Sequence, residues 1–223
     1  MKLTILAATG GIGRQLLEQA VAEGHEVTAV VRNPAKLADH PTVRVVRADL
    51  AGAGAAELRP AVEGADAVLS GLGAVGKAGL GVAEHGTRAA VEAMRQAGVR
   101  RIVVVSAAPI GTVASPARPH PPRHDPGDGF VMRHVLSPVV KAVLRGHYAD
   151  LARMEDVLHA SGLDWTVIRP PQLTDKPLGR DYRIAYGRNI RGGRTASRAD
   201  VAHCMLRSLR EPEMVGRTVG IAD

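Results

Sequence analysis

The sequence predicts an α/β domain built on a doubly wound parallel sheet. Short runs of β-branched and apolar residues alternate with helical patterns through the first half of the chain, and no shift in composition divides that half. Such alternation is typical of βαβ units, in which helices cover both faces of a parallel sheet. The length of 223 residues fits one domain, so we expect a single unit over residues 1–223.

Six strands are predicted in chain order, each from a short apolar run. They are Lys2–Ala7, Val27–Val31, Val43–Val46, Ala67–Ser70, Ile102–Val105 and Trp165–Ile168. Apolar residues at spacings of three and four predict the helices between and after these strands. The helices are Ile12–Glu23, a short helix opened by Asn33-Pro34, Ala55–Val62, Val82–Ala97, a long amphipathic helix from Ser137 to Gly162, and Ser197–Leu209.

Two segments lack such periodicity. Residues 109–129 are rich in Pro, Gly and His, and residues 169–179 form a second, Pro-rich loop. Long loops at the strand ends of a sheet often cover a site. We therefore expect the 109–129 loop, together with a small carboxyl-terminal segment over residues 170–195, to cover a substrate site.

The charge balance favours small anionic ligands over nucleic acid. Lys and Arg outnumber Asp and Glu by 29 to 22, a formal charge of +7, but the excess is spread along the chain. Aromatic residues make up only 2% of the sequence, which leaves few rings for the base stacking that single-strand binders use. We expect no nucleic-acid partner and an attraction for anionic small molecules.

Other features of the sequence indicate a cytoplasmic protein with no membrane partner and no bound metal. The longest uncharged run, Ile102 to Ala117, has 16 residues, which is too short to span a bilayer, and the amino terminus lacks a secretory cleavage pattern. The single cysteine, Cys204, cannot form an internal disulfide, as is typical of a reducing compartment. His120 and His124 are spaced like metal ligands, but no Cys or carboxylate stands at a matching position.

A glycine-rich turn, Thr9-Gly10-Gly11-Ile12-Gly13, lies between the first predicted strand and the first predicted helix. Glycine lets the backbone turn tightly and approach a pyrophosphate, and the N–H groups at a helix start attract its negative charge. Tight strand-to-helix turns also use glycine for steric reasons alone. The position of the turn favours a Rossmann-like dinucleotide site.

Arg32 ends the second predicted strand, 19 positions after Gly13. Dinucleotide sites usually place Asp or Glu there for the adenosine ribose, whereas a guanidinium can bind the 2′-phosphate of NADPH. Such a charge-assisted contact contributes about 1.5 to 3 kcal/mol, a roughly 10- to 150-fold preference for NADPH over NADH. The alternative is a solvated surface arginine. Because the usual acid is missing at this position, we favour phosphate binding.

The stretch after the fourth predicted strand superficially resembles a phosphate loop. Gly71 and Lys77 have a suitable spacing, but Ala78 stands where Ser or Thr would bind Mg²⁺. An ATPase or kinase is therefore excluded. We interpret Leu72 and Gly73 as a turn that passes close to the phosphates and ribose of the cofactor.

Several stretches together resemble atypical short-chain dehydrogenase/reductase proteins of the NAD(P)H-binding, flavin reductase and biliverdin-IXβ reductase type. They span nearly the whole chain, and the run from Arg153 through Asp175 is the most family-like part. The matching stretches are Leu6–Gly13, Val30–Asn33, Ala48–Leu50, Asp66–Val68, Val105–Ala107, Arg153–Met154, Ser161–Leu163 and Pro170–Asp175.

The resemblance implies a set of contacts with NADP(H). Gly10 to Gly13 would hold the pyrophosphate, and Arg32 would bind the 2′-phosphate. The other contacts implied are Asp49 and Leu50 beside the adenine, Leu72 and Gly73 along the phosphates, and Ser106, Pro170, Pro171, Gln172 and Leu173 around the nicotinamide.

Three positions depart from the patterns of these relatives. Ala7 replaces the usual first glycine of the turn, and Gln172 stands where the biliverdin reductases have a histidine, which disfavours bilin reduction. The usual acid of the superfamily is a Tyr followed four residues later by Lys, but Tyr148 is followed by Ala152. A phenol near its ordinary pKa of about 10 is a poor proton donor at neutral pH. Tyr148 therefore either lines the pocket or is a rim residue of its helix.

These observations predict an NADPH-dependent oxidoreductase that transfers hydride directly to a flavin, quinone or similar conjugated acceptor. The candidate catalytic residues are Ser106 and Tyr148; the hydroxyl of Ser106, at the end of the fifth strand, either faces the substrate or caps a turn. The alternative is a non-catalytic regulator that senses NADP(H), similar to NmrA-like proteins. A nucleotide-sugar epimerase or dehydratase is disfavoured because the chain leaves little room for a sugar-binding domain.

Overall fold

The chain folds around one large sheet and one small sheet in the computed structural model, which describes residues 1–37, 40, 42–73, 79–129 and 143–223. The strands of the large sheet are β1 (Lys2–Leu6), β2 (Glu26–Val31), β3 (Arg44–Arg47), β4 (Ala67–Ser70), β5 (Arg101–Val105), β6 (Asp164–Arg169), β8 (Arg183–Tyr186) and β10 (Arg217–Ala222). The small sheet pairs β7 (Gln172–Thr174) with β9 (Thr195–Ser197). The α-helices are α1 (Gly11–Ala22), α2 (Ala55–Val62), α3 (Val82–Ala97), α5 (Arg145–His159) and α6 (Arg198–Arg207), and short 3₁₀ helices cover Pro34–Leu37, Ala108–Thr112, Ser208–Arg210 and Pro212–Met214.

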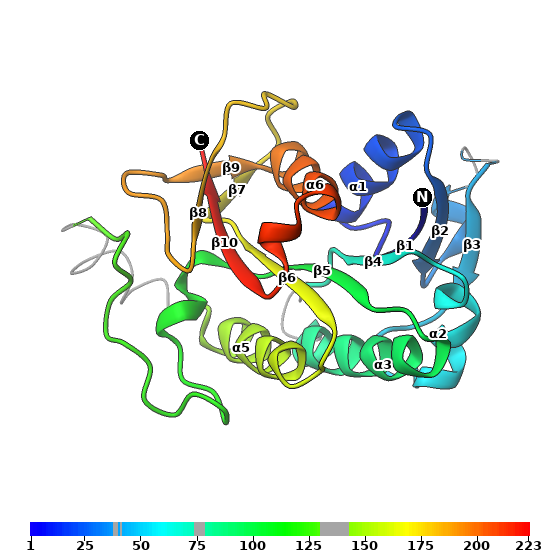
Figure 1. The fold of residues 1–223 in the computed structure, drawn as a ribbon, viewed down its shortest axis with the longest axis horizontal. Coiled ribbons are helices and arrows are strands. Elements are labelled where there is room, and N and C mark those ends of the chain that lie inside the picture. Colours follow the sequence, from blue (N-terminus) through cyan, green and yellow to red (C-terminus); the bar gives the residue numbers. More distant parts are fainter. Residues whose placement is uncertain (38–39, 41, 74–78, 130–142) are drawn as a thin grey trace.

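The large sheet separates two helical layers. Helices α1 and α6 cover one face, and α2, α3 and α5 cover the other (Figure 1). The strand order is β3-β2-β1-β4-β5-β6-β10-β8, and every neighbouring pair is parallel except β10 with β8. This arrangement is the doubly wound, Rossmann-like sheet that the sequence predicts, so the predicted fold class is confirmed.

The strand order reverses beside β1. The chain moves outward from β1 to β3 and then returns to the other side of β1 with β4, so that Leu6 pairs with Val30 on one side and with Ser70 on the other. Ligands of open α/β sheets bind outside the carboxyl ends of the strands at such a reversal. The topology therefore places a candidate site at the turns that follow β1 and β4.

Strand β1 shows why the sequences of the central strands are almost entirely apolar. Leu3 and Ile5 pack into the core on the α1 side, whereas Leu6 packs into the core on the α2 side. The polar exception, Thr4, donates a 2.5 Å hydrogen bond to the carbonyl of Ala61 in α2. A parallel strand covered by helices on both faces must be apolar at nearly every position, and this requirement makes β1 to β6 recognisable in the sequence.

The predictions for the chain after β6 were incomplete. The Pro-rich loop expected over residues 169–179 contains β7, and β8, β9 and β10 were not predicted. Strand β10 contains Gly220, where an added Cβ would lie 2.3 Å from the carbonyl oxygen of Arg188. Glycine and alanine have low β-propensity, so a strand that uses them to admit a neighbouring loop gives a weak sequence signal.

The long helix predicted from Ser137 is only partly within the described residues. Helix α5 begins at Arg145, and the first predicted turns, residues 137–142, lie outside the part of the chain that the structure describes. The predicted cap of the last helix is confirmed, because the Ser197 hydroxyl accepts a 2.9 Å hydrogen bond from the N–H of Asp200.

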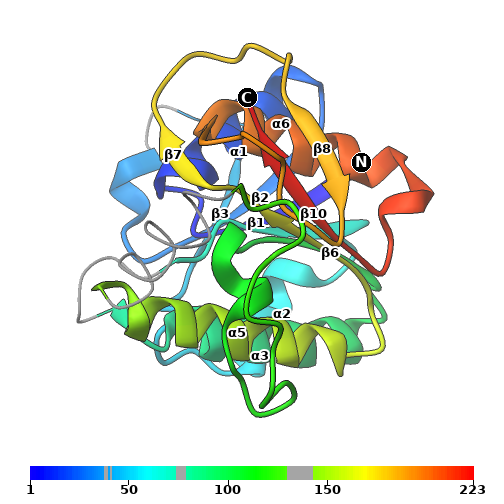
Figure 2. The same ribbon diagram turned by 90° about the vertical axis from the view of Figure 1, so that its left-hand side faces the viewer.

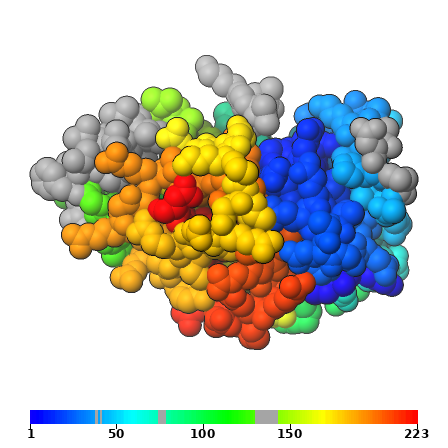
Figure 3. Space-filling model, turned by 90° about the horizontal axis from the view of Figure 1, so that it is seen from above, coloured from blue at the N-terminus to red at the C-terminus, as the bar shows by residue number. Residues whose placement is uncertain are grey.

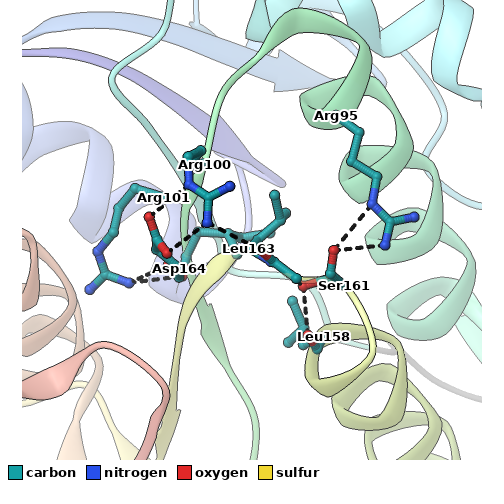
Figure 4. A network of polar contacts seen from close by, with 9 residues as sticks. Arg95, Arg100, Arg101, Leu158, Ser161, Leu163 and Asp164 are labelled. Atoms are coloured by element: carbon teal, nitrogen blue, oxygen red, sulfur yellow. Dashed lines mark hydrogen bonds and ion pairs between the residues drawn. The ribbon is translucent and has the colours of Figure 1, made fainter.

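Arginines fix the amino-terminal ends of β5 and β6 (Figure 4). Arg95 in α3 donates to the carbonyl of Ser161 at 2.7 Å, and Arg100 pairs with Asp164 at 3.2 Å. Arg101 donates to the carbonyl of Asp164 at 2.8 Å. These contacts lie at the edge opposite the candidate site. They hold β5 and β6 side by side, so that the carboxyl ends of the two strands emerge together.

Over the described residues, three further features concern membranes, metals and the single cysteine. Within these ranges no helix is long and apolar enough to cross a membrane, and no group of three or more His, Cys, Asp or Glu side chains could hold a metal ion. Burial raises the pKa of the Cys204 thiol to about 12. A thiol with this pKa stays protonated at neutral pH and acts as a small core side chain.

Candidate functional site

The turn between β1 and α1 brings the helix start close to the strand end. Ala7 has a positive φ of 56°, and the N–H of Gly10 donates a 2.8 Å hydrogen bond to its carbonyl. An added Cβ on Gly13 would lie 2.1 Å from that same carbonyl oxygen, and one on Gly71 would lie 3.0 Å from the amide nitrogen of Gly13. The turns after β1 and β4 therefore meet through glycines at the point where the strand order reverses.

Replacing Ala7 with glycine is expected to raise the free energy of unfolding by about 1 kcal/mol, because an L-residue in the left-handed region is strained where glycine is not. The change would appear in urea titrations as a higher midpoint with an unchanged slope. Ala8 is fully buried, and its φ is not positive. The matched variant Ala8→Gly is therefore expected to lose stability. A decrease for Ala7→Gly would contradict the strain assigned to this position.

The two helices that start at this edge differ in whether their N–H groups are free. Helix α1 begins after Gly10, and no described side chain caps it. At the start of α3, by contrast, the carboxylate of Asp150 accepts hydrogen bonds from the N–H groups of Gly81, Ala83 and Glu84 at 3.0, 3.2 and 3.0 Å. An anionic ligand group is stabilised by free N–H groups at a helix start. Of these two helix starts, that of α1 is therefore the candidate phosphate site.

Arg32 stands exposed just after β2, the strand next to β1. Its guanidinium makes no ion pair with any described residue, whereas the Asn33 side chain is already used as acceptor for the N–H of Ala35 at 3.1 Å. An unpaired guanidinium beside the candidate site is suited to bind a phosphate bidentately.

The residues expected near the adenine and phosphates lie partly in the core. Asp49 is exposed, but Leu50 and Leu72 are buried and meet at Gly86 in α3. An added Cβ on Gly86 would lie 3.2 Å from the carbonyl oxygen of Leu50 and 3.0 Å from a methyl carbon of Leu72. Only the backbone of these leucines can therefore border a ligand. Gly86 was not singled out from the sequence, although a glycine inside a helical pattern is a signal of close packing.

Ser106 belongs to a buried polar network at the end of β5. Its hydroxyl donates a 2.7 Å hydrogen bond to Oε1 of Glu155 in α5, and Nε of Arg169 donates to the same oxygen at 2.9 Å. Nη2 of Arg169 completes the ion pair with the second oxygen of Glu155, and all three side chains are buried. The hydroxyl proton is thus directed to Glu155, so Ser106 can only accept a hydrogen bond from a ligand while this contact persists. Glu155 was not singled out from the sequence, because it lies 49 residues away from Ser106.

Tyr148 is buried in the core between α5 and the sheet, so the rim interpretation is not supported. Ala152, at the position of the expected lysine, is fully buried and brings no cation. Burial raises the pKa of the Tyr148 phenol above its ordinary value. The phenol therefore remains neutral and can serve as a hydrogen-bond donor but not as a ready acid.

His147, which was not singled out from the sequence, lies beside the turn after β4. The imidazole is half-buried, and its Cε1 lies 3.9 Å from the position that a Cβ on Gly73 would take. Its Nδ1 is buried and has no hydrogen-bond partner among the described residues. Burial lowers the pKa of His147 against the opposing effect of the Asp150 carboxylate, which favours a neutral ring beside the turn after β4. The adjacent Tyr148 was the signal that could have pointed to it.

The segment after β6 contacts the end of β5 and then continues toward the start of α1. The N–H of Ala108 donates to the carbonyl of Pro170 at 2.9 Å, which ties this segment to β5. Pro171 and Leu173 are half-buried, and Gln172 is exposed at the start of β7. Seen from above, the segment (yellow) lies directly against the amino-terminal βα unit (blue) in Figure 3.

The 109–129 loop follows the flank of α5 and reaches the chain between β8 and β9 (Figure 2). The Ser115 hydroxyl donates to the Asp156 carboxylate at 2.9 Å, and the N–H of Asn189 donates to Asp125 at 2.8 Å. Between this loop and β6, β8 and β10 lies a cavity of about 670 Å³, whose wall includes Arg169. Arg169 thus borders this cavity and also pairs with Glu155, the acceptor of the Ser106 hydroxyl. That the loop covers a substrate remains a prediction.

The fold and the site define a dinucleotide-binding protein. Among the described residues, neither the N–H groups at the start of α1 nor the Arg32 guanidinium has a side-chain partner, and glycines admit a close ligand. The sequence pattern of the NAD(P)H-binding family matches residues 7–212, and the chain belongs to that family. NAD(P)H is accordingly the cofactor, and the resemblance found in the sequence is confirmed.

The alignments with known proteins of similar sequence or fold extend over the whole chain. The protein named "uncharacterized sugar epimerase YhfK" of Bacillus subtilis is 28% identical over 230 residues, covering 100% of this chain and 94% of that one. A short-chain dehydrogenase/reductase of Veillonella parvula, solved in complex with NADP, superposes with a TM-score of 0.76 at 20% identity, covering 100% of this chain and 94% of that one. The anaerobilin reductase ChuY of Escherichia coli O157:H7 has a TM-score of 0.76 at 22% identity, with 100% and 97% covered.

Proposed function

We propose that the protein is an NADPH-dependent oxidoreductase that transfers hydride from the nicotinamide directly to a flavin, quinone or similar conjugated acceptor. The observation that carries the proposal is the surroundings of Tyr148: a buried phenol with a raised pKa and Ala152 in place of a lysine. Reduction of a simple carbonyl needs a proton donor. A conjugated ring spreads the charge of the added hydride over many atoms and needs little acid help.

The chain's own residues then act by binding and orientation. The start of α1 holds the diphosphate, and Arg32 holds the 2′-phosphate. Ser106, fixed by Glu155, presents a hydroxyl oxygen as acceptor, and Tyr148 presents a neutral donor. Pro170 and its neighbours position the two ring systems, because hydride delivery between rings depends mainly on holding them in contact. When bound, the nicotinamide supplies the hydride.

The comparisons support this proposal at the level of the fold. ChuY is named as an anaerobilin reductase, and the Veillonella protein was solved with NADP. The exposed Arg32, without a partner among the described residues, favours NADPH over NADH in this chain as well. Gln172 in place of a histidine argues for an acceptor other than a bilin.

The test is the consumption of NADPH by the purified protein, followed by absorbance, with a panel of riboflavin, FMN, a benzoquinone, a bilin and a simple ketone. We expect turnover with a flavin or quinone and none with the ketone. Calorimetric binding of NADPH with no consumption across the panel would contradict an enzyme.

The second candidate function is a non-catalytic sensor of NADP(H), similar to NmrA-like proteins. The absence of a lysine after Tyr148 is the observation that favours it, because a sensor needs no acid. A sensor would bind NADPH and NADP⁺ with different affinities and turn over no acceptor, so the same panel distinguishes the two candidates.

Replacing Ser106 with alanine is expected to lower turnover about 2- to 10-fold, the effect of losing one neutral hydrogen bond, and to change NADPH affinity less. Steady-state rates and calorimetry would separate the two effects. Ser161→Ala is the matched control, because that buried serine also donates to α5, to the carbonyl of Leu158 at 2.6 Å, but lies at the edge opposite the candidate site. Unchanged kinetics in Ser106→Ala would assign Ser106 a structural role.

A further inference from the structure

Arg198, the first residue of α6, lies over the first residue of α1. Helices α1 and α6 pack side by side on the same face of the sheet (Figure 1). An added Cβ on Gly11 would lie 2.7 Å from Nε and 2.8 Å from Cδ of Arg198. The arginine therefore occupies the space that a side chain at position 11 would fill, beside the N–H groups that α1 offers to a phosphate.

Among the described residues, one ion pair holds the guanidinium there. Its Nη1 lies 2.6 Å from Oδ1 of Asp175, and Nε, the nitrogen nearest Gly11, has no acceptor among the described residues. Asp175 follows β7 and Arg198 follows β9, and the last pair of these strands is Thr174 with Ser197. The small sheet thus places both charges at the same edge.

The ion pair between Arg198 and Asp175 is weak enough for Arg198 to exchange the carboxylate for another anion. The Asp175 side chain is 88% exposed and that of Arg198 is 31% exposed. Ion pairs exposed to solvent contribute little to stability, because water screens them and two flexible side chains must be ordered. A dinucleotide diphosphate carries more negative charge than one carboxylate. It would also meet the guanidinium beside the positive end of a helix.

We propose that Arg198 is a diphosphate-binding residue of the NAD(P)H site. On cofactor binding, its guanidinium leaves Asp175 and donates charge-assisted hydrogen bonds to the diphosphate held at the start of α1. The diphosphate is then bound from two sides, by the first βα unit and by α6, and the segment from β7 to β9 is tied to the cofactor. The inference rests on NAD(P)H binding and is independent of turnover.

Arg198 and Arg32 should affect cofactor binding in different ways. The diphosphate is common to NADPH and NADH, whereas the 2′-phosphate belongs to NADPH alone. Loss of Arg198 is therefore expected to weaken both cofactors by the same factor, about 10- to 150-fold for a charge-assisted contact. Adenosine 2′-monophosphate, which lacks the diphosphate, should keep its affinity for the Arg198 variant.

The experiment measures the binding of these three ligands by calorimetry to the full chain and to Arg198→Ala. The matched control is Arg207→Ala, because Arg207 lies at the other end of α6 and also pairs with a carboxylate, that of Glu211. The control is expected to bind all three ligands normally. If Arg198→Ala binds NADPH and NADH within twofold of the original protein, the proposal is wrong, whereas the proposed reductase activity would be unaffected by that result.

A second variant tests the exchange itself. Asp175→Asn removes the competing charge and leaves Arg198 in place, so NADPH and NADH are expected to bind about two- to fivefold more tightly, in keeping with the small strength of an exposed pair. Weaker binding would show that Asp175 holds Arg198 in its working position, and the exchange would be excluded. Thermal unfolding of each variant without ligand shows that the fold is retained.

Discussion

Replacing Glu155 with alanine is expected to lower the free energy of unfolding by about 3 to 5 kcal/mol, the cost of leaving one partner of a buried ion pair alone. Glu155 is 1% exposed and accepts hydrogen bonds from Ser106 and Arg169. Its removal leaves a buried guanidinium without its carboxylate and a serine hydroxyl without its acceptor. Urea-induced unfolding measures the loss, which is a large fraction of the stability of a typical domain.

Two further variants separate this cause from a general effect of mutating α5. Arg153→Ala breaks the 2.5 Å pair with Glu84, which is partly exposed, and is expected to cost no more than about 1 kcal/mol. The double variant Glu155→Met/Arg169→Met leaves no lone charge and is expected to be more stable than Glu155→Ala. A double variant that is less stable than Glu155→Ala would mean that the unpaired charge is not the main cost.

Replacing Arg32 with alanine is expected to weaken NADPH binding about 10- to 150-fold and to change NADH binding less than about twofold. A guanidinium bound to the 2′-phosphate contributes a charge-assisted contact that only NADPH can form. Calorimetry with both cofactors provides the measurement. Arg32→Glu should go further and reverse the preference, because an acid at this position binds the ribose hydroxyls of NADH and repels a phosphate.

The control for this prediction is Arg44→Ala. Arg44 is also exposed, but it lies at the amino-terminal end of β3, whereas Arg32 follows the carboxyl-terminal end of β2. It is expected to leave both affinities unchanged. Equal losses of NADPH and NADH in Arg32→Ala would remove the role assigned to Arg32 and would leave the fold and the diphosphate site untouched.

The first part of the fold could be predicted from the sequence because its signals are local. Strands β1, β2, β4, β5 and β6 are largely buried between helices, so each contains a short apolar run, and α3 has the predicted bounds Val82–Ala97. The last part could not be predicted in the same way. Strand β10 pairs with β6 across a long stretch of chain and contains a glycine required by a neighbouring loop, so its identity depends on contacts and not on its own residues.

The residues of the candidate site also fall into a group that local sequence signals predicted and a group that they did not. The glycine turn and Arg32 were predicted because a nucleotide-binding turn is a contiguous motif between a strand and a helix. Glu155, His147 and Arg198 were not, because each acquires its importance from a partner distant in sequence. Ser106 was predicted as a strand-end residue, but the proton of its hydroxyl is directed to α5, which its own segment does not indicate.

By itself the sequence determined the order of strands and helices as far as β6, the doubly wound class of the sheet, and the turn at which glycine admits a dinucleotide. These depend on the spacing of apolar residues and on backbone conformations available within a few residues. Only the tertiary structure decided that Asp150 fills the start of α3, that Glu155 holds Ser106, and that Arg198 lies over Gly11. The physical reason is that hydrogen bonds and ion pairs form between side chains that packing brings together, whatever their separation along the chain.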